Sequence, residues 1–358
     1  MKLRILAVVS VCCALIVVFL DATFSSENAG GQVVSQVTEA EVHTPVEKRR
    51  AEEQTFLTFP EWFLVYSSDE YADLVQTRPP SEFPFLEHIG QFWQGYSVMH
   101  RATKDDYVFN SDYHVMIMVI GTSTTIECGM KWAYEATTGR LAEATSLYGT
   151  TAEDQLAADI AREYVDFLDI EPWYKFDYDG ALKRLWTETP LIGPGMLRKW
   201  ERRYALTTEY ALKSVYARAI RQGSESAYGV VEPVTTVLVD RVTRAAYDEL
   251  QKATVVSVDF DHSALVELPR YQPFSDCAIA FARHDINFIE IAGNRNAILI
   301  TAIVNDDFAL NRPILMTQPI LTRPGRQRIA LTVPVGQLTA AINKLTQLDG
   351  TIEHVYDY

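Results

Sequence analysis

A change of hydrophobic periodicity near Lys252 is the feature that most constrains how this 358-residue chain folds. Before it, apolar residues recur at the three- and four-residue spacing of amphipathic helices, and after it they alternate as in strands. The alternation begins at residues 256–260. All six tryptophans lie on the helical side, between Trp62 and Trp200. The sequence therefore predicts an α+β protein, with a mainly helical domain followed by a domain that contains a sheet.

The helical domain is expected to span residues 55–252. It opens on an aromatic stretch at 55–66, in which Pro60 suits the first turn of a helix because its missing N–H costs nothing there. We expect these aromatic side chains to fill a core rather than to form a platform for a ligand. Further helices are predicted at 83–102, 111–145, 152–168, 179–187 and 196–222.

Two Ser/Thr-x-x-Glu patterns in this domain are typical of capping boxes at helix N-termini. Ser67 and Glu70 predict the start of one helix, and Thr150 and Glu153 predict the start of another. Residues 115–120 are apolar on every side and are followed by small residues. This composition predicts a buried helix at the axis of the domain, because small residues let neighbouring helices approach.

Residues 253–358 are expected to form a ferredoxin-like antiparallel α/β sandwich. Strands are predicted at 256–260, 264–268, 287–292, 297–304, 327–333 and 351–356, with helices at 272–283 and 335–348. This order predicts a single sheet with two helices on one face. The other face would be open to a partner, and His354, Tyr356 and Tyr358 share one face of the last strand because side chains alternate.

The first 20 residues predict an export segment. Lys2 and Arg4 precede an uncharged run at 5–20, and Asp21 closes it. A positive region before an apolar block is typical of export signals, and the run is slightly shorter than the roughly 17–25 residues that span a bilayer. Residues 23–25 make a poor peptidase site, so we favour an uncleaved signal-anchor, a transmembrane helix, over a cleaved signal peptide.

This leader sets the expected location of the protein. With Lys2 and Arg4 inside, the chain is a single-pass membrane protein whose body lies on the extracytoplasmic side. Residues 21–54 are polar and sustain no hydrophobic period, so they are predicted to form a flexible tether between the membrane and the body.

Charge and cysteine content narrow the possible functions. The net charge of −15 argues against non-specific nucleic-acid binding, because phosphates repel an acidic surface. Cys12 and Cys13 lie in the leader and count as small apolar residues. Cys128 and Cys277 either form one disulfide or remain two buried thiols. We favour two thiols, because a lone long-range bridge needs a specific geometry.

The sequence lacks the motifs whose chemistry fixes their spacing. It contains no Gly-rich phosphate loop, no His-Glu-x-x-His helix and no Cys-x-x-Cys pair. Residues 121–125 approach a nucleophile elbow but lack its second glycine, so Ser123 is not expected to be a nucleophile. No cofactor is predicted, and no catalytic or metal-binding residue is assigned.

Polar titratable side chains in the predicted central helices form the first candidate site. Histidines and carboxylates that converge can bind a metal or share a proton. The residues are His88, His100, His114, Glu127 and Glu135. Their spacing matches no ligand template, which favours side chains that are satisfied one by one.

A basic, aromatic segment at 196–204 is the second candidate. Its cations would either dock on anionic lipid, with the aromatic rings at the headgroup level, or pair with acidic residues of the same chain. The residues are Arg198, Lys199, Trp200, Arg202, Arg203 and Tyr204. We favour internal pairing, because the negative net charge opposes approach to an anionic membrane.

Together these inferences predict a membrane-tethered, extracytoplasmic binding or accessory protein of the cell envelope without enzymatic activity. It would meet the membrane through residues 5–20, and its expected partner is another envelope protein. The alternative is an envelope enzyme, hydrolytic or metal-dependent, with its site among the histidines and glutamates of the central helices. Convergence of three of these side chains would favour the enzyme, and their dispersal would favour the binding module.

Overall fold

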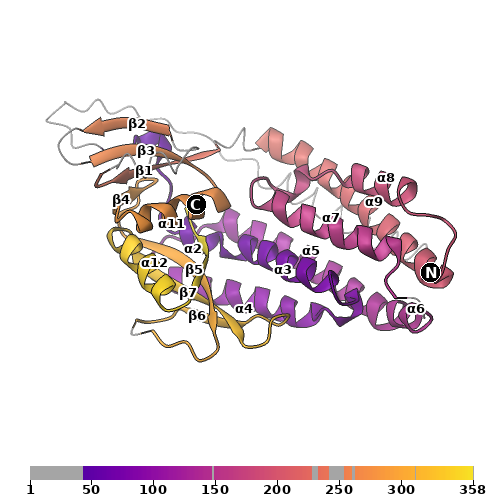
Figure 1. Ribbon diagram of the computed structural model, residues 1–358. Coiled ribbons are helices and arrows are strands. Elements are labelled where there is room, and N and C mark those ends of the chain that lie inside the picture. The colour runs from indigo at the N-terminus through magenta and orange to yellow at the C-terminus, as the bar shows by residue number, and fades with distance from the viewer. Residues whose placement is uncertain are drawn as a thin grey trace.

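The chain forms a helical arm and a β-rich body, which lie end to end (Figure 1). The computed structural model describes residues 43–146, 149–227, 233–241, 254–259, 263–310 and 312–357. The predicted leader, most of the predicted tether and Tyr358 lie outside these ranges. Among the helices within them, none combines the length and the apolar character that crossing a bilayer requires.

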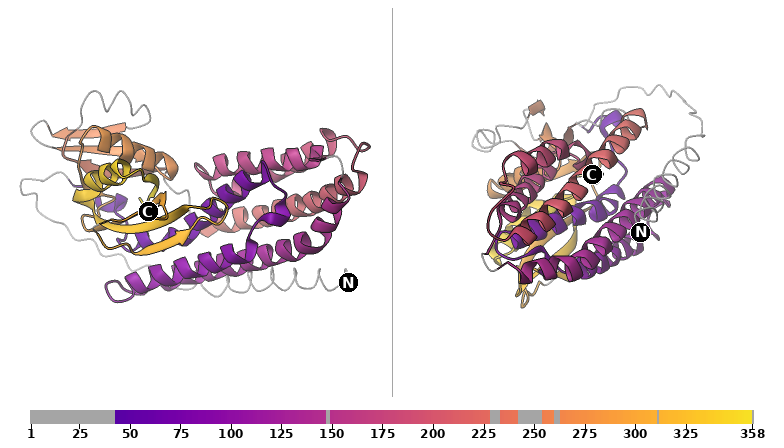
Figure 2. Two further views of the ribbon diagram at one scale, coloured as in Figure 1. Left: turned by 60° about the horizontal axis from the view of Figure 1, so that its bottom comes forward. Right: turned by 90° about the vertical axis from the view of Figure 1, so that its right-hand side faces the viewer.

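The arm contains each of the predicted helices, with ends displaced by a few residues. Their bounds are α2 (Gln54–Leu57), α3 (Phe59–Val75), α4 (Phe85–Thr103), α5 (Ser111–Tyr134), the π-helical turn η3 (Glu135–Gly139), α6 (Arg140–Ala144), α7 (Ala152–Leu168), α8 (Tyr178–Thr187) and α9 (Met196–Ala227). The left view in Figure 2 shows the long helices of this set running along the length of the arm.

Helix α3 carries the aromatic stretch into the core, as predicted. It runs without a break from Phe59 to Val75, and Pro60 lies in its first turn. The predicted cap at Ser67 is wrong, because the helix begins about two turns earlier. The buried aromatic residues of 55–66 pack on one face of a sheet in the body, against Leu299 and Tyr356 among others.

Helix α5 is not the buried axis that its apolar composition predicted. Val115 and Met118 are 38% and 45% exposed, so this helix lies at the surface of the arm. Its other side packs on α4 at Gly121, where a Cβ atom would lie 2.6 Å from the ring of Phe92 and 2.7 Å from that of Trp93. The expectation about small residues is thus confirmed, whereas the buried position is wrong.

The body contains two four-stranded antiparallel sheets, which confirms the α+β class but differs from one ferredoxin-like sheet. The strand orders are β2-β3-β1-β4 and β6-β7-β5-β8. The elements are β1 (Val234–Val239), β2 (Thr254–Asp259), β3 (Ser263–Pro269), α11 (Gln272–Arg283), β4 (Phe288–Ile291), β5 (Ala297–Asn305), β6 (Met316–Pro319), β7 (Arg326–Pro334), α12 (Leu338–Gln347) and β8 (Thr351–Val355). Strands β1 and β6 were not predicted, and β1 precedes the predicted boundary at residue 253.

The two sheets repeat one β-β-β-α-β topology. In each repeat the third and fourth strands both pair antiparallel with the first, so they run parallel to one another and a helix connects them. This is a split β-α-β unit, the element that ferredoxin-like folds also use. Each connecting helix is followed by an aspartate in the left-handed region, Asp285 with φ 53° and Asp349 with φ 58°.

The pairing of the first strand with the fourth carries the same register shift in both repeats. The β1–β4 pairing shifts between Leu238 and Val239, and the β5–β8 pairing shifts between Thr301 and Ala302. In both repeats two pairs of residues come before the shift, an apolar pair and then one more pair, so the two shifts lie at equivalent positions. The inner faces of both sheets and the helices α11 and α12 share a single hydrophobic core. The body is therefore one folding unit built from two similar halves.

A fragment that starts at residue 253 should not fold on its own. It lacks β1, which lies inside the first sheet and pairs with both β3 and β4. Its removal leaves the backbone N–H and C=O groups of both neighbouring strands unpaired and deletes buried Val237 and Val239 from the common core. Urea titration followed by circular dichroism should show no cooperative transition for residues 253–358, and a cooperative transition would contradict the central role of β1.

Candidate functional site

The outer face of the second sheet is covered, not open as predicted. Helix α3 lies across it, with the ring of Trp62 stacked on that of His354 at 3.5 Å between centroids. Tyr66 Oη is 2.8 Å from both Tyr356 Oη and Thr301 Oγ1. His354 and Tyr356 are buried by these contacts, so they join the arm to the body and present no surface to a partner.

His88 belongs to a second buried polar group at the same junction. Its Nε2 lies 3.4 Å from an oxygen of Glu70, which also meets Arg328 of β7 at 3.3 Å. Arg328 in turn binds Glu353 at 2.6 Å and lies over the ring of Tyr66. Burial raises the pKa of Glu70, but its hydrogen bond with His88 and the charge of Arg328 outweigh this, and the pKa is lowered.

His100 and His114 are the two candidate residues that come together. Their ring centroids are 4.9 Å apart, and Tyr96 Oη lies 3.0 Å from His114 Nδ1. The ring of Phe109 stacks on His114 at 4.4 Å. Burial, and to a lesser extent His100, lowers the pKa of His114, so His114 favours the neutral imidazole. Within the described residues no group of three His, Cys, Asp or Glu side chains is arranged to hold a metal ion.

Glu127 lies in a ladder of four charges between α5 and α9. It contacts Lys131 at 3.2 Å and Lys213 at 3.3 Å, and both lysines also bind Glu209. Burial raises the pKa of Glu127, but Lys213 and Lys131 outweigh it, so the pKa lies below its usual range. The ladder holds two cations and two anions, and its net charge is zero.

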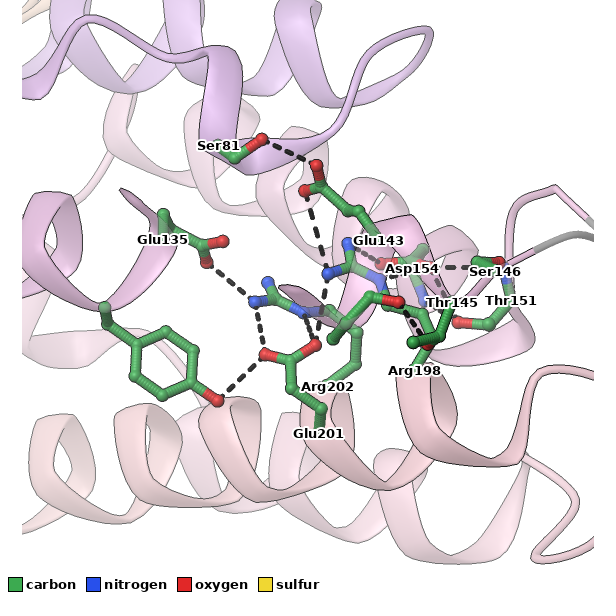
Figure 3. A network of polar contacts seen from close by, with 12 residues as sticks. Ser81, Glu135, Glu143, Thr145, Ser146, Thr151, Asp154, Arg198, Glu201 and Arg202 are labelled. Carbon is green, nitrogen blue, oxygen red and sulfur yellow. Dashed lines mark hydrogen bonds and ion pairs between the residues drawn. The ribbon is translucent and has the colours of Figure 1, made fainter. Parts of the chain in front are cut away.

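Glu135 belongs to the larger ion-pair network that Figure 3 shows, formed by the basic segment of α9. It accepts a hydrogen bond of 2.8 Å from Arg202, which also binds Glu201 at 2.7 Å. Arg198 meets Asp154 at 2.9 Å and Glu201 at 3.1 Å. Burial raises the pKa of Glu135 despite Arg202. All four cations of the segment are buried in such pairs, so the prediction of internal pairing is confirmed.

Glu153 anchors the other two cations of the basic segment. It is fully buried and meets Lys199 at 2.9 Å and Arg203 at 2.6 Å. The predicted capping role of Glu153 is therefore wrong. The capping box of α7 is made one residue later, by Thr151 and Asp154. These pairs tie α7 to the N-terminal part of α9 and close the far end of the arm.

Replacing Arg203 should destabilise the protein far more than replacing an exposed arginine of the same helix. Arg203→Met leaves the carboxylate of Glu153 buried with one partner fewer, which costs about 3–5 kcal/mol in broken buried pairs. The matched control is Arg218→Met, since Arg218 is 64% exposed and pairs with exposed Asp179, a kind of pair worth at most about 1 kcal/mol. Urea unfolding measures both free energies, and equal losses would contradict the internal role of the basic segment.

Glu61 and Asp357 are two carboxyl groups that the sequence did not single out. Burial raises the pKa of Glu61 to about 7 and that of Asp357 to about 6, although Arg270 opposes both shifts. Asp357 accepts a hydrogen bond of 2.7 Å from Thr235. The neighbouring Tyr271 has a φ of 66°, which is strained for a bulky side chain. Only tertiary contacts bring these groups together, because they come from α3 and both sheets.

The raised pKa of Glu61 should make stability fall as the pH rises. Its protonated form is favoured in the folded state, so its contribution is fully present below the ordinary pKa of 4.5 and is lost on passing about pH 7. Glu61→Gln should remove this slope and stabilise the protein at pH 8 by up to about 3 kcal/mol, since one pKa unit corresponds to about 1.4 kcal/mol. Thermal unfolding from pH 4 to 8 measures the effect. An unchanged slope in the variant would assign it to other groups.

The cysteines of the body are not bridged. Cys128 and Cys277 are both free thiols, which confirms the favoured prediction, although Cys128 is only partly buried. Burial, and then the charge of Glu127, raises the pKa of Cys128 to about 11. This thiol is therefore protonated at neutral pH and is a poor nucleophile. Ser123 donates its hydroxyl hydrogen to the carbonyl of Ile120, in keeping with a structural role.

Comparison with protein-family models, with curated proteins and with solved structures finds no match to this chain.

Proposed function

We propose that the chain is a membrane-tethered, extracytoplasmic binding or accessory protein of the cell envelope that acts without catalysis. The observation that carries this proposal is the dispersal of the candidate residues. His88, Glu127 and Glu135 lie in three separate ion-pair groups, and only His100 and His114 meet. Such groups stabilise a rigid arm and body, as expected of a protein that binds a partner through its surface rather than acting at a catalytic site.

The location in this proposal rests on the leader. Residues 5–20 would cross the membrane once, with Lys2 and Arg4 inside and residues 21–42 joining the crossing to the body. We also propose a distant relationship with ferredoxin-like domains, supported by the split β-α-β unit in each repeat. An envelope protein remains the proposed partner.

An envelope enzyme is the second candidate, and a specific observation favours it. Tyr96, His100 and His114 form a compact polar group, and Glu61 has a pKa of about 7, a value suited to proton transfer at neutral pH. The full chain would then hydrolyse a member of a panel of esters, phosphate esters or glycosides, and His114→Gln would abolish that activity. A panel without turnover favours the binding protein.

A topology experiment tests the proposed location. A reporter enzyme that is active only outside the cytoplasm, fused after Tyr358, should be active, and the protein should remain with membranes after alkaline washing. Lys2→Glu with Arg4→Glu should lower the outward-facing fraction, because positive residues hold the N-terminus inside. A shortened form released into the soluble fraction would show that the leader is a cleaved signal peptide and not an anchor. An inactive reporter would refute the extracytoplasmic location.

A further inference from the structure

Helix α5 presents an uncharged stripe to solvent along most of its length. The exposed side chains recur every three or four residues, the spacing of one helix face. They include Val115, Met118, Ile126 and Met130, of which Met130 is 55% exposed. From residue 115 to residue 133 the most exposed residues of this helix are uncharged, and the one charged side chain with substantial exposure is Glu127, 44% exposed beside its two lysine partners. A solvent-facing helix surface is normally polar, so this stripe is expected to contact an apolar surface.

Helix α9 presents a second stripe of the same kind. Its exposed side chains include Trp200, Tyr204, Leu212 and Val215, of which Tyr204 is 68% exposed. No exposed position from residue 196 to residue 215 is charged. The cations of the basic segment are interleaved with these residues in sequence but point inward to Glu153, Asp154 and their neighbours. The outer surface of α9 is therefore apolar where its sequence is most basic.

The two stripes lie on the same side of the arm. Helices α5 and α9 run antiparallel, since Glu127 meets Lys213 and Lys131 meets Glu209. On both helices an exposed residue directly precedes each of these facing residues, as Met130 precedes Lys131 and Leu212 precedes Lys213. One step back turns a helix by about 100°. Because the two helices run in opposite directions, a rotation of about 100° away from their contact places both stripes on the same side of the helix pair.

Together the stripes define a surface that we name the α5–α9 face. The charge ladder between them has no net charge, and its side chains are about a quarter exposed except for Glu127, which is 44% exposed. The α8–α9 connection adds exposed Leu191 and Ile192 at the end of the α9 stripe, with Ile192 80% exposed. The 24 residues of α5 alone extend the face over about 36 Å at about 1.5 Å per residue.

We propose that the α5–α9 face lies on the lipid bilayer, its apolar side chains in the interfacial layer and Trp200 and Tyr204 at the headgroup level. The proposal rests on the membrane tether of the proposed function and adds a second contact to it. The apolar stripes suit the interfacial layer, where the partly exposed ladder can stay in contact with water. A net charge of −15 makes the contact hydrophobic rather than an attraction to anionic lipid.

Tryptophan quenching in vesicles tests this contact, with a matched control in the same arm. The full chain is reconstituted into phosphatidylcholine vesicles whose acyl chains carry bromine, which quenches indoles at the membrane. Trp200 and Trp132 are 43% and 47% exposed. Trp132 follows Lys131 rather than preceding it, so it lies on the opposite side of the helix pair. The ring of Trp186 lies 6.4 Å from that of Trp200 and this residue is 47% exposed, so both tryptophans can report the contact. Quenching should fall in Trp200→Phe, be lost when Trp186→Phe is added, and be retained in Trp132→Phe.

A second variant keeps the test independent of one fluorophore. Met118→Glu with Ile126→Glu places charge on exposed positions, so the fold should persist, as near-ultraviolet circular dichroism checks. The quenching of Trp200 should fall while the chain still sediments with vesicles through its leader. Equal quenching in zwitterionic and anionic vesicles is expected, and a requirement for anionic lipid would overturn the hydrophobic contact.

Other results would separate this inference from the tether. A chain that sediments with vesicles but shows no quenching of Trp200 would refute the α5–α9 contact and leave the tether standing. A chain that does not sediment would refute the tether. Disulfide formation between Cys12 or Cys13 and an Ile126→Cys variant would show that the leader covers the face. Cross-linking of Ile126→Cys between copies would show a dimer, and either result overturns the bilayer contact.

Discussion

Pairing of buried charges is the constraint on which the rest of the structure depends. Taking a charge out of water costs several kcal/mol unless a partner and hydrogen bonds replace the solvent. Arg203, Arg328 and Glu153 are almost completely buried and each has a partner on another element. The positions of α7, α9, α3 and β7 are consequently coupled, because displacing one of these elements would leave a buried charge alone.

The same constraint explains how the arm is joined to the body. Helix α3 brings Glu70 to Arg328, and its aromatic residues cover the outer face of the second sheet. The outer face of the first sheet is met by the segment before α2, where Thr44 N–H donates to Glu290 and Lys48 pairs with Glu267. The two repeats of the body thus share a topology but differ in what covers them. One is fixed by a long helix, and the other by a short N-terminal segment.

The arm combines an apolar core and buried ion pairs with an uncharged stripe on the outer side of both α5 and α9. Along α5 and α9 the charged side chains point toward one another, and the uncharged ones point outward. In a water-soluble bundle the arrangement is the reverse, because apolar side chains gain by leaving water. The proposed contact with lipid would explain why apolar side chains are exposed on this side while the charged side chains are paired between the helices. The inversion is also consistent with a protein held close to a membrane.

Local regularity in the sequence was enough to locate most elements. The 3.6-residue period predicted the helices of the arm and α11, and the period of two predicted β3, β5, β7 and β8, because both depend on neighbours in the chain. The aromatic stretch at 55–66 was correctly assigned to a core for the same reason, since large apolar rings are buried wherever a core forms. The free thiols and the internal pairing of the basic segment also followed from composition and charge.

Tertiary contacts decided what local patterns leave open. The β1 strand and the division into two sheets depend on pairing between residues far apart, and a capping pattern does not say which of two adjacent residues caps the helix. The same holds for α5, whose composition predicted burial although its neighbours cover only one side. His354 and Glu61 acquired their surroundings from α3 and the sheets together. The sequence by itself determined the helices, most of the strands and the internal pairing of the basic segment, because these are properties of short segments and of composition. Only the tertiary structure decided which faces are covered, since that depends on where distant segments meet.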